Sequence, residues 1–263
     1  MTDVTKISNV VVGMEVKIIS ITNSSKTSSG IIYKIISLRD NPNGIEVMLK
    51  NGDQGNVISI ENSIEVIIQR IMDTESDVSD NKRNFYDEDM THEAIPHVVS
   101  SFMNADGGYV YVGVVDDAKS LEDKLLGLKP EKDILVEKLS KNPNNQNKEL
   151  TDQKFHDIYR DDIEEALSEH LTTSTRLGKL TDFNFIKIND KTILEILIRK
   201  SPAPVFYSNP SRTKHSKFIV TLRNKNYPSR ELDEFHYRNG SQKTHCDTFE
   251  EFLHFYEKNF LSK

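Results

Sequence analysis

Short runs that alternate between apolar and polar residues dominate the first quarter of the chain. The segments VVVGMEVKIIS, GIIYKIIS, GIEVMLK and QGNVISI follow one another before Ile64, and a period of two with many β-branched residues is typical of strands. The stretches TNSSKTSSG, RDNPNG and KNGD between them supply the Asn, Gly, Ser and Pro of tight turns. Four or five such strands predict a small β-barrel over residues 1–69.

The pattern changes near residue 69. From there on, segments with the apolar spacing of helices alternate with segments typical of single strands. Apolar positions three and four residues apart predict helices over 95–103, 131–139, 152–171 and 248–260. Strands are predicted over 109–115, 217–224 and 234–246, and in a hairpin over 183–200 that turns at Asn189-Asp190. The predicted fold class is therefore α+β: a small N-terminal β-barrel followed by a mixed α/β core over residues 70–263.

Charge is segregated along the chain, although the net charge is −7. Residues 72–90 carry seven acids against Lys82 and Arg83, whereas residues 199–230 carry no acid at all. Such segregation suits a protein that binds a polyanion on one surface and a cation on another, and it equally fits two solvated loops of opposite sign. The candidate nucleic-acid-binding cations of the acid-free stretch are Arg199, Lys200, Arg212, Lys214, Lys217, Arg223 and Lys225.

Cysteine content and hydropathy limit which cellular compartment and which disulfide or metal sites we expect. Cys246 is the only cysteine, which excludes an internal disulfide and a zinc site built from several cysteines. No apolar run reaches the length of a membrane span, and the N-terminus lacks the basic start and the cleavage site of a signal peptide. We expect a cytoplasmic protein. The sequence also contains neither a Walker phosphate loop nor a His-Glu-x-x-His motif.

An apolar strand that ends on two acids is the most suggestive local feature. In NADGGYVYVGVVDD, residues 104–117, Asp116 follows the apolar run directly, and the end of a buried strand is a rigid place for a functional side chain. Gly107 and Gly108 permit a sharp turn and the close approach of a ligand. Asp116 would then hold a metal, a proton or a phosphate. In the alternative reading, Asp116 and Asp117 only open the turn DDAKS.

An ordered series of short motifs resembles the AlbA-type domain of the Schlafen family. The series starts with Glu75-Ser76, Asp80 and Lys82 and continues with PHVVSSFMNADGGYVYVGVVDD. LLGL, SPAPVFY and FHYRNGSQKTH follow in the family's order, so that the resemblance covers residues 70–258. The first 69 residues resemble the small YwbE-like family of unknown function through GMEVKI, SSGIIYKI and NPNGIEVMLKNGDQGNVISI.

The Schlafen resemblance implies metal-dependent cleavage of RNA, chiefly of tRNA and rRNA. It assigns three catalytic carboxylates to Glu75, Asp80 and Asp116, and carboxylates of this kind bind hard cations such as Mg²⁺ or Mn²⁺. Lys82 would contact the scissile phosphate or offset the acidic cluster. Arg238, in the closing Tyr-x-Arg-x-Gly-Ser element, would hold a phosphate or pin the last strand.

Three departures from the family pattern keep other functions open. Asp80 replaces a glutamate, Asn81 a phenylalanine and Val115 an aspartate. An aspartate reaches about 1.5 Å less far than a glutamate, whereas metal–ligand distances tolerate only about 0.2 Å. The zinc site of eukaryotic Schlafens cannot be built with Cys246 alone. Besides an endoribonuclease, the chain fits an RNA- or DNA-binding regulator, or an interaction protein whose acids form a solvated face.

The resemblance also leads us to expect a homodimer. Eukaryotic Schlafen cores resemble two linked copies of this domain around a basic valley that accommodates an RNA stem, and this chain has one copy. A two-fold dimer would double the basic strip without new sequence. The C-terminal helix offers a wide apolar face that would contact a partner or pack on its own domain; its members are Phe249, Phe252, Leu253, Phe255, Tyr256 and Phe260.

Overall fold

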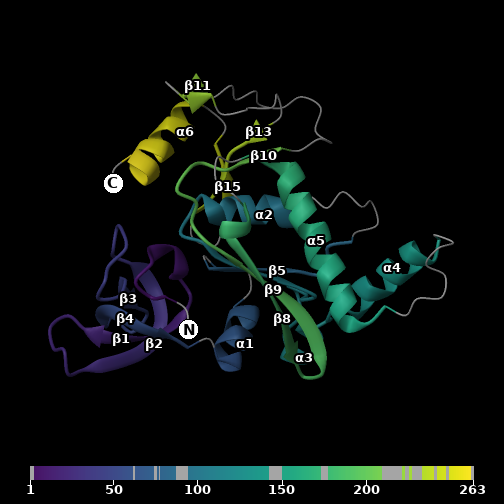
Figure 1. Ribbon diagram of the computed structural model, residues 1–263, viewed down its shortest axis with the longest axis horizontal. Helices are drawn as coiled ribbons and strands as arrows, with labels where there is room; N and C mark the ends of the chain where they lie inside the picture. Colours follow the sequence, from purple (N-terminus) through teal and green to yellow (C-terminus); the bar gives the residue numbers. More distant parts are fainter. Residues whose placement is uncertain are drawn as a thin grey trace.

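The fold combines a small barrel with a larger sheet-and-helix body (Figure 1). The structure is a computed structural model. It describes residues 3–61, 63–73, 76, 78–86, 94–141, 150–172, 177–208, 221–222, 225–226, 233–239, 242–246 and 249–261. The barrel lies at the lower left of the view, and the helices α4 and α5 lie on the opposite side of the sheet-and-helix body.

The barrel is formed by four antiparallel strands in the order β1-β2-β3-β4. These strands are β1 (Glu15–Ser20), β2 (Thr27–Ile35), β3 (Glu46–Leu49) and β4 (Gln54–Ile60), after a 3-10 turn at Ile7–Asn9. Alternation places one face of each strand inside, so that Val16, Ile18, Ile32 and Val57 are almost completely buried. The barrel predicted from the sequence is confirmed.

A helix that the sequence pattern does not predict connects the barrel to the rest of the chain. This helix, α1 (Ile64–Met72), begins at Ser63, whose hydroxyl accepts a hydrogen bond from the Val66 N–H at 3.4 Å. Val66, Ile67 and Ile71 lie on its buried face. The helix runs through position 69, where the sequence places its change of pattern.

The central sheet has the strand order β5-β6-β9-β8. Its strands are β5 (Ser79–Lys82), β6 (Gly108–Val112), β8 (Thr181–Ile188) and β9 (Lys191–Ile198). β5 and β6 are parallel and are connected through α2 (Ala94–Met103). β8 and β9 form the predicted hairpin, and its turn residues Asn189 and Asp190 have φ of 47° and 63°, the left-handed conformation of a tight hairpin turn.

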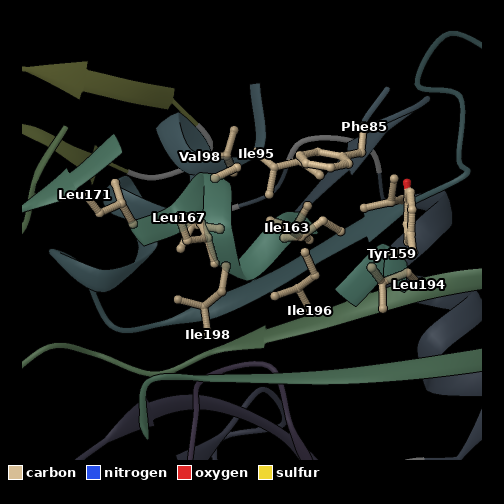
Figure 2. Packing of buried hydrophobic residues seen from close by; sticks show 14 of the residues in the cluster. Phe85, Ile95, Val98, Tyr159, Ile163, Leu167, Leu171, Leu194, Ile196 and Ile198 are labelled. Atoms are coloured by element: carbon tan, nitrogen blue, oxygen red, sulfur yellow. The ribbon is translucent and has the colours of Figure 1, made fainter. Parts of the chain in front are cut away.

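One face of this sheet is covered by helices of the same body. α2 and α5 (Asp152–His170) pack on it, and Figure 2 shows Val98 and Ile163 of these helices facing Ile196 and Ile198 of β9. α4 (Lys129–Ser140), which also belongs to this layer, follows the short α3 (Leu121–Lys124). The predicted helices over 95–103, 131–139 and 152–171 are therefore confirmed.

The opposite face of the sheet is covered by the barrel and α1. Tyr109 and Tyr111 of β6 and Leu197 of β9 belong to the same buried cluster as Val16 and Ile32 of the barrel. Barrel and sheet therefore share one continuous hydrophobic core, and the barrel supplies the cover that this face of the sheet requires.

A buried polar group lies in this shared core, and we call Arg70, Tyr111 and Glu195 the joint cluster. The Arg70 guanidinium of α1 donates to the Gly13 carbonyl at 2.6 and 3.0 Å and lies 3.7 Å from the Glu195 carboxylate. The Tyr111 hydroxyl donates to the same carboxylate at 3.0 Å. Burial raises the pKa of Glu195 above its usual 4.5. The cluster joins the barrel, α1 and the sheet.

The C-terminal part adds small sheets and one helix to the α2 side. β7 (Leu171–Thr172), β10 (Phe206–Ser208) and β13 (Asp233–Glu234) form one sheet, and β11 (Thr221–Leu222) pairs with β12 (Lys225–Asn226). β14 (His236–Asn239) and β15 (Gln242–His245) form a hairpin. The remaining helical segments are Leu177–Lys179, α6 (Phe249–Tyr256) and the π turn Glu257–Leu261.

The apolar face of α6 contacts its own chain at Phe252. This ring is fully buried, with its centroid 4.9 Å from that of Phe235 and 5.7 Å from that of Phe206. Phe255, Tyr256 and Phe260 are half-buried beside it. Over the ranges that the structure describes, no helix combines the length and the apolar character needed to cross a bilayer.

Candidate functional site

Asp80 lies at the centre of a buried charged group on β5. Its register partner on β6 is Val110, a member of the core under α2, so the Asp80 side chain points to the α2 face of the sheet. Only 4% of this side chain is exposed. One carboxylate oxygen is ion-paired with Lys82, and the other is ion-paired with Arg238 of β14. We call Asp80, Lys82 and Arg238 the strand cluster.

Arg238 is held on three sides. Besides its ion pair with Asp80, it donates to the Ser76 carbonyl at 3.2 Å. Its guanidinium carbon lies 4.2 Å from the centre of the Phe102 ring, a cation–π contact with α2. Only 3% of the Arg238 side chain is exposed. In this arrangement Arg238 pins the last hairpin to β5 and to the backbone next to Glu75.

Lys82 is the member of the strand cluster that reaches the surface. Its side chain is 19% exposed, and its ammonium group donates to the Asn81 carbonyl at 3.1 Å in addition to pairing with Asp80. Since an ammonium group carries three donors, Lys82 retains one for a further acceptor. A phosphate that approaches β5 would meet Lys82 before it meets Asp80 or Arg238.

The opposite side of β5 is fixed by the end of α1. The Asn81 amide donates to the Ile71 carbonyl at 3.0 Å, and the Ser79 hydroxyl donates to the Arg70 carbonyl at 3.3 Å. These carbonyls belong to the last turn of a helix, where no intrahelical donor is available. Asn81 therefore ties the candidate site to α1 and through it to the barrel.

Asp116 lies in a loop rather than at the end of a strand. β6 ends at Val112, earlier than the predicted strand 109–115, because Gly113 takes a φ of +87° and turns the chain. Val114 then makes a single bridge with Leu125. The buried Lys124 donates to the Asp116 carbonyl at 2.8 Å, so the backbone of Asp116 is held although it has left the sheet.

The two glycines of NADGG, Gly107 and Gly108, are needed for packing within the chain. Gly107 has a φ of +81°, and an added Cβ would lie 2.5 Å from the Ile198 carbonyl oxygen. A Cβ on Gly108 would lie 2.5 Å from the Phe102 ring. The close approach that these glycines permit is therefore made by strand β9 and helix α2.

Two residues that sequence reasoning does not single out hold the site in place. The fully buried Asn104 donates to the carbonyls of Val205 and His236 at 2.7 Å each and accepts from the Val205 N–H at 2.8 Å. Asn104 therefore ties the end of α2 to β14, two residues before Arg238. The sequence signal is the asparagine of NADGG, which directly follows the predicted helix over 95–103.

Glu131 of α4 fixes the chain just after β5. One of its carboxylate oxygens accepts from the backbone N–H groups of Phe85 and Tyr86 at 3.0 and 2.9 Å and from the Tyr159 hydroxyl at 2.7 Å. Burial raises the pKa of Tyr159 well above 10.0, so this hydroxyl stays protonated and donates. No signal in a single sequence marks Glu131, because it lies on a helix of ordinary charged composition.

The cations predicted to bind nucleic acid are resolved in part. Arg199 is ion-paired with Asp182, and Lys200 is ion-paired with Asp106 at 2.9 Å. Acids distant in sequence therefore offset the two cations at the start of the acid-free stretch. Lys225 is described in its backbone only, as part of β12. Glu75, Arg212, Lys214, Lys217 and Arg223 lie outside the described residues.

The described part of the chain does not by itself complete a metal site. Within it, no group of three His, Cys, Asp or Glu side chains is arranged to hold an ion. Asp80 and Asp116 have the oxygen donors that Mg²⁺ and Mn²⁺ prefer. An ionised carboxylate offers about four lone-pair sites, so the pairing of Asp80 with two cations leaves acceptor capacity. The third predicted ligand, Glu75, is outside the described ranges.

Comparisons with known proteins identify a family and a distant structural likeness. None of the curated proteins searched matches the chain. Among solved structures, the DIP2311 protein from Corynebacterium diphtheriae is similar with a TM-score of 0.38 and 11% identity. That match covers 76% of this chain and 29% of that one. Residues 75–247 match the family described as Schlafen, AlbA_2. This match spans most of the chain, which therefore belongs to the Schlafen AlbA_2 family.

Proposed function

We propose that this protein is a divalent-metal-dependent endoribonuclease that cleaves structured RNA such as tRNA or rRNA. The observation that carries the proposal is the parallel pairing of β5 with β6. Because the two strands run in the same direction, the loop from Gly113 to Asp116 starts beside Lys82, whose carbonyl accepts from Gly113 and Val114 at 2.9 and 3.1 Å. The candidate acid Asp80 therefore lies on β5, and Asp116 lies in the loop that follows the neighbouring parallel strand β6.

The third acid of the proposal is Glu75, and the anchoring of its neighbour supports it. Arg238 binds both the Asp80 carboxylate and the carbonyl of Ser76, the residue after Glu75. A bound Mg²⁺ or Mn²⁺ would polarise a phosphate oxygen and lower the pKa of a bound water. Lys82 would bind a phosphate of the RNA, and Arg238 would keep Asp80 in one orientation.

The test is a substitution of Asp116 with its neighbour as control. We expect Asp116→Asn to abolish Mn²⁺-dependent cleavage of tRNA by the purified full-length chain while the melting temperature stays nearly constant. Asp117→Asn removes an exposed carboxylate one residue away and is expected to leave cleavage unchanged. Full activity of Asp116→Asn would refute the assignment. Cleavage that persists in chelator would refute the metal dependence.

A second candidate function is RNA or DNA binding without cleavage. It is favoured by the charges of the strand cluster, where one carboxylate faces two cations. Such a group carries an excess positive charge and attracts a phosphate more readily than a metal ion. RNA binding in chelator, together with no cleavage in Mn²⁺ by the wild-type chain, would establish this function in place of the first.

The acid-free stretch is the proposed RNA-contacting segment of the core. Replacing Arg212, Lys214 and Lys217 by glutamate would weaken RNA binding and flatten its salt dependence. Each lost phosphate contact lowers the slope of log affinity against log salt concentration by about 0.7 to 0.9. Binding measured over a series of salt concentrations reports this slope. An unchanged slope would place the RNA on another surface.

We further propose that the active form is a homodimer. Phe252 packs inside its own chain, so a contact through α6 would use the half-buried Phe255, Tyr256 and Phe260. A two-fold dimer would double the number of phosphate-binding cations. Light scattering at micromolar concentration decides the matter, since a mass that remains at 30.1 kDa contradicts the dimer.

A further inference from the structure

The barrel has an outward-facing tyrosine that its strand pairing exposes. Ile32 of β2 pairs with Leu49 of β3, but the next pair is Lys34 with Met48, so Tyr33 is an extra residue in β2. A bulge of this kind re-aims side chains and often lies next to a functional site. Here it makes Tyr33 and Lys34 consecutive exposed residues.

Tyr33 is unusual among the aromatic side chains of this protein. It is 57% exposed, and no other Phe or Tyr in the described ranges is among the exposed large apolar side chains. The ring is therefore available to a planar partner. A second bulge, at Ile58 of β4, leaves that side chain 42% exposed on the other side of β1.

Three lysines lie on, or directly after, the strands β1, β2 and β3. Lys34 follows Tyr33 directly, and Lys50 leaves β3 with its N–H bonded to the Ile31 carbonyl at 2.8 Å. Lys17 of β1 pairs with Ser29, further along β2. None of these three lysines is ion-paired with any residue that the structure describes.

The acids on the same strands are engaged by uncharged donors. Glu15 accepts from the Ser63 N–H at 3.3 Å, and Glu46 accepts from the Gln54 amide at 2.6 Å. The lysines therefore remain available to an anionic ligand. An exposed ring with lysines on its own and the neighbouring strands fits a nucleic-acid strand, whose bases stack and whose phosphates are negative, better than an apolar protein surface, which would leave the lysines unpaired.

We propose that the outer face of β1, β2 and β3 is a binding site for single-stranded RNA. Tyr33 stacks on a base, and Lys17, Lys34 and Lys50 contact the phosphates. The proposal gives the barrel a role, and it rests on the proposed function only in taking RNA as the ligand. Because barrel and sheet share one core, this face holds an RNA flank at a fixed position relative to β5.

The test measures binding of a fluorescein-labelled oligouridylate to the full-length chain by fluorescence anisotropy. Chelator is present throughout, so that cleavage plays no part. We expect Tyr33→Ala to weaken binding roughly tenfold, the loss of one stacked base, and Tyr33→Phe to bind like the wild type. The double variant Lys34→Gln/Lys50→Gln is expected to lower the salt dependence by about 1.4.

Two control variants separate this site from the rest of the barrel. Leu38→Ala removes a side chain that is 71% exposed on the loop after β2. Lys26→Gln removes a cation next to the opposite end of β2. Both are expected to bind the oligouridylate like the wild type. Unchanged melting temperatures would show that the Tyr33 variants are folded.

Three results would overturn the proposal. The first is that the wild type does not bind oligouridylate, and the second is that Tyr33→Ala binds it as tightly as the wild type. The third is that Tyr33→Ala changes its oligomeric state without a change in affinity, which would identify a protein contact. The cleavage assay with Asp116→Asn is independent of all three. Cleavage that depends on Asp116 with unaltered binding by Tyr33→Ala would refute the barrel site and leave the proposed function standing.

Discussion

The two faces of the central sheet each hold a buried charged group. The two groups differ in their balance of charges and in how completely they are shielded from solvent. The joint cluster pairs one cation with one carboxyl group and buries both, Arg70 to 3% and Glu195 to 5% side-chain exposure. The strand cluster pairs two cations with one carboxylate and leaves Lys82 19% exposed. A balanced and closed group suits a structural joint, whereas an excess cation that reaches the surface suits contact with an anion.

The largest expected effect comes from removing the barrel, which covers one face of the central sheet. Deletion of residues 1–62 exposes Tyr109, Tyr111 and Leu197, which are buried against the barrel. We expect residues 63–263 to aggregate or to lack a cooperative unfolding transition, measured by circular dichroism and gel filtration beside the full-length chain. A monomeric fragment that unfolds cooperatively would show that the sheet-and-helix body folds without the barrel.

Breaking the joint cluster comes next. Arg70→Met leaves Glu195 without its cation and the Gly13 carbonyl without its donor, and we expect a loss of about 3–5 kcal/mol in the free energy of unfolding. Urea denaturation measures it. Adding Glu195→Leu should recover part of that loss, because an apolar pair replaces a broken ion pair. No recovery would mean that Arg70 acts mainly through Gly13.

The strand cluster should respond less, and unequally, to the loss of its cations. Arg238→Met is expected to cost about 2–4 kcal/mol of unfolding free energy, since Asp80 keeps Lys82 as a partner. Lys82→Met should cost about 1 kcal/mol or less, as for other partly exposed pairs, while weakening RNA binding. Equal costs for the two variants would contradict the distinction between an anchoring Arg238 and a ligand-facing Lys82.

The smallest expected effect is a pH dependence confined to the joint cluster. Because burial raises the pKa of Glu195 in the folded chain above 4.5, this group contributes stability below pH 4.5 that is lost as the pH rises through the folded pKa. Glu195→Gln cannot titrate. The stability of the wild type relative to this variant should therefore fall as the pH increases from 4, measured by urea midpoints. A constant difference would contradict the raised pKa.

The same contrast between faces explains what the sequence could predict. The barrel follows from local alternation, and the β8–β9 hairpin from Asn189-Asp190, because both signals lie within a few residues of one another. β5 could not be predicted, since its sequence SDNK is polar throughout. Its burial depends on partners such as Ile71, Val110 and Arg238, which only the folded chain brings together.

The sequence indicates candidate residues for the site but not how they are arranged. The motif residues Asp80 and Lys82 are adjacent in the structure, as their spacing in an extended chain allows. The ion pair of Asp80 with Arg238 could not be read from the sequence, because no local pattern encodes it. The loop position of Asp116 follows from the turn at Gly113. The apolar run VGVV looks like a continuous strand and does not indicate this positive φ.

The distance in sequence between Asp80 and Arg238, 158 residues, has a consequence for biosynthesis. A nascent chain presents Asp80 and Lys82 to the cell early, while β14 is still to be translated. The hairpin that pins β5 becomes available only after the 158 further residues up to Arg238 have been translated. The strand cluster is therefore completed long after β5 is made, and a chain that terminates before Arg238 lacks an assembled site.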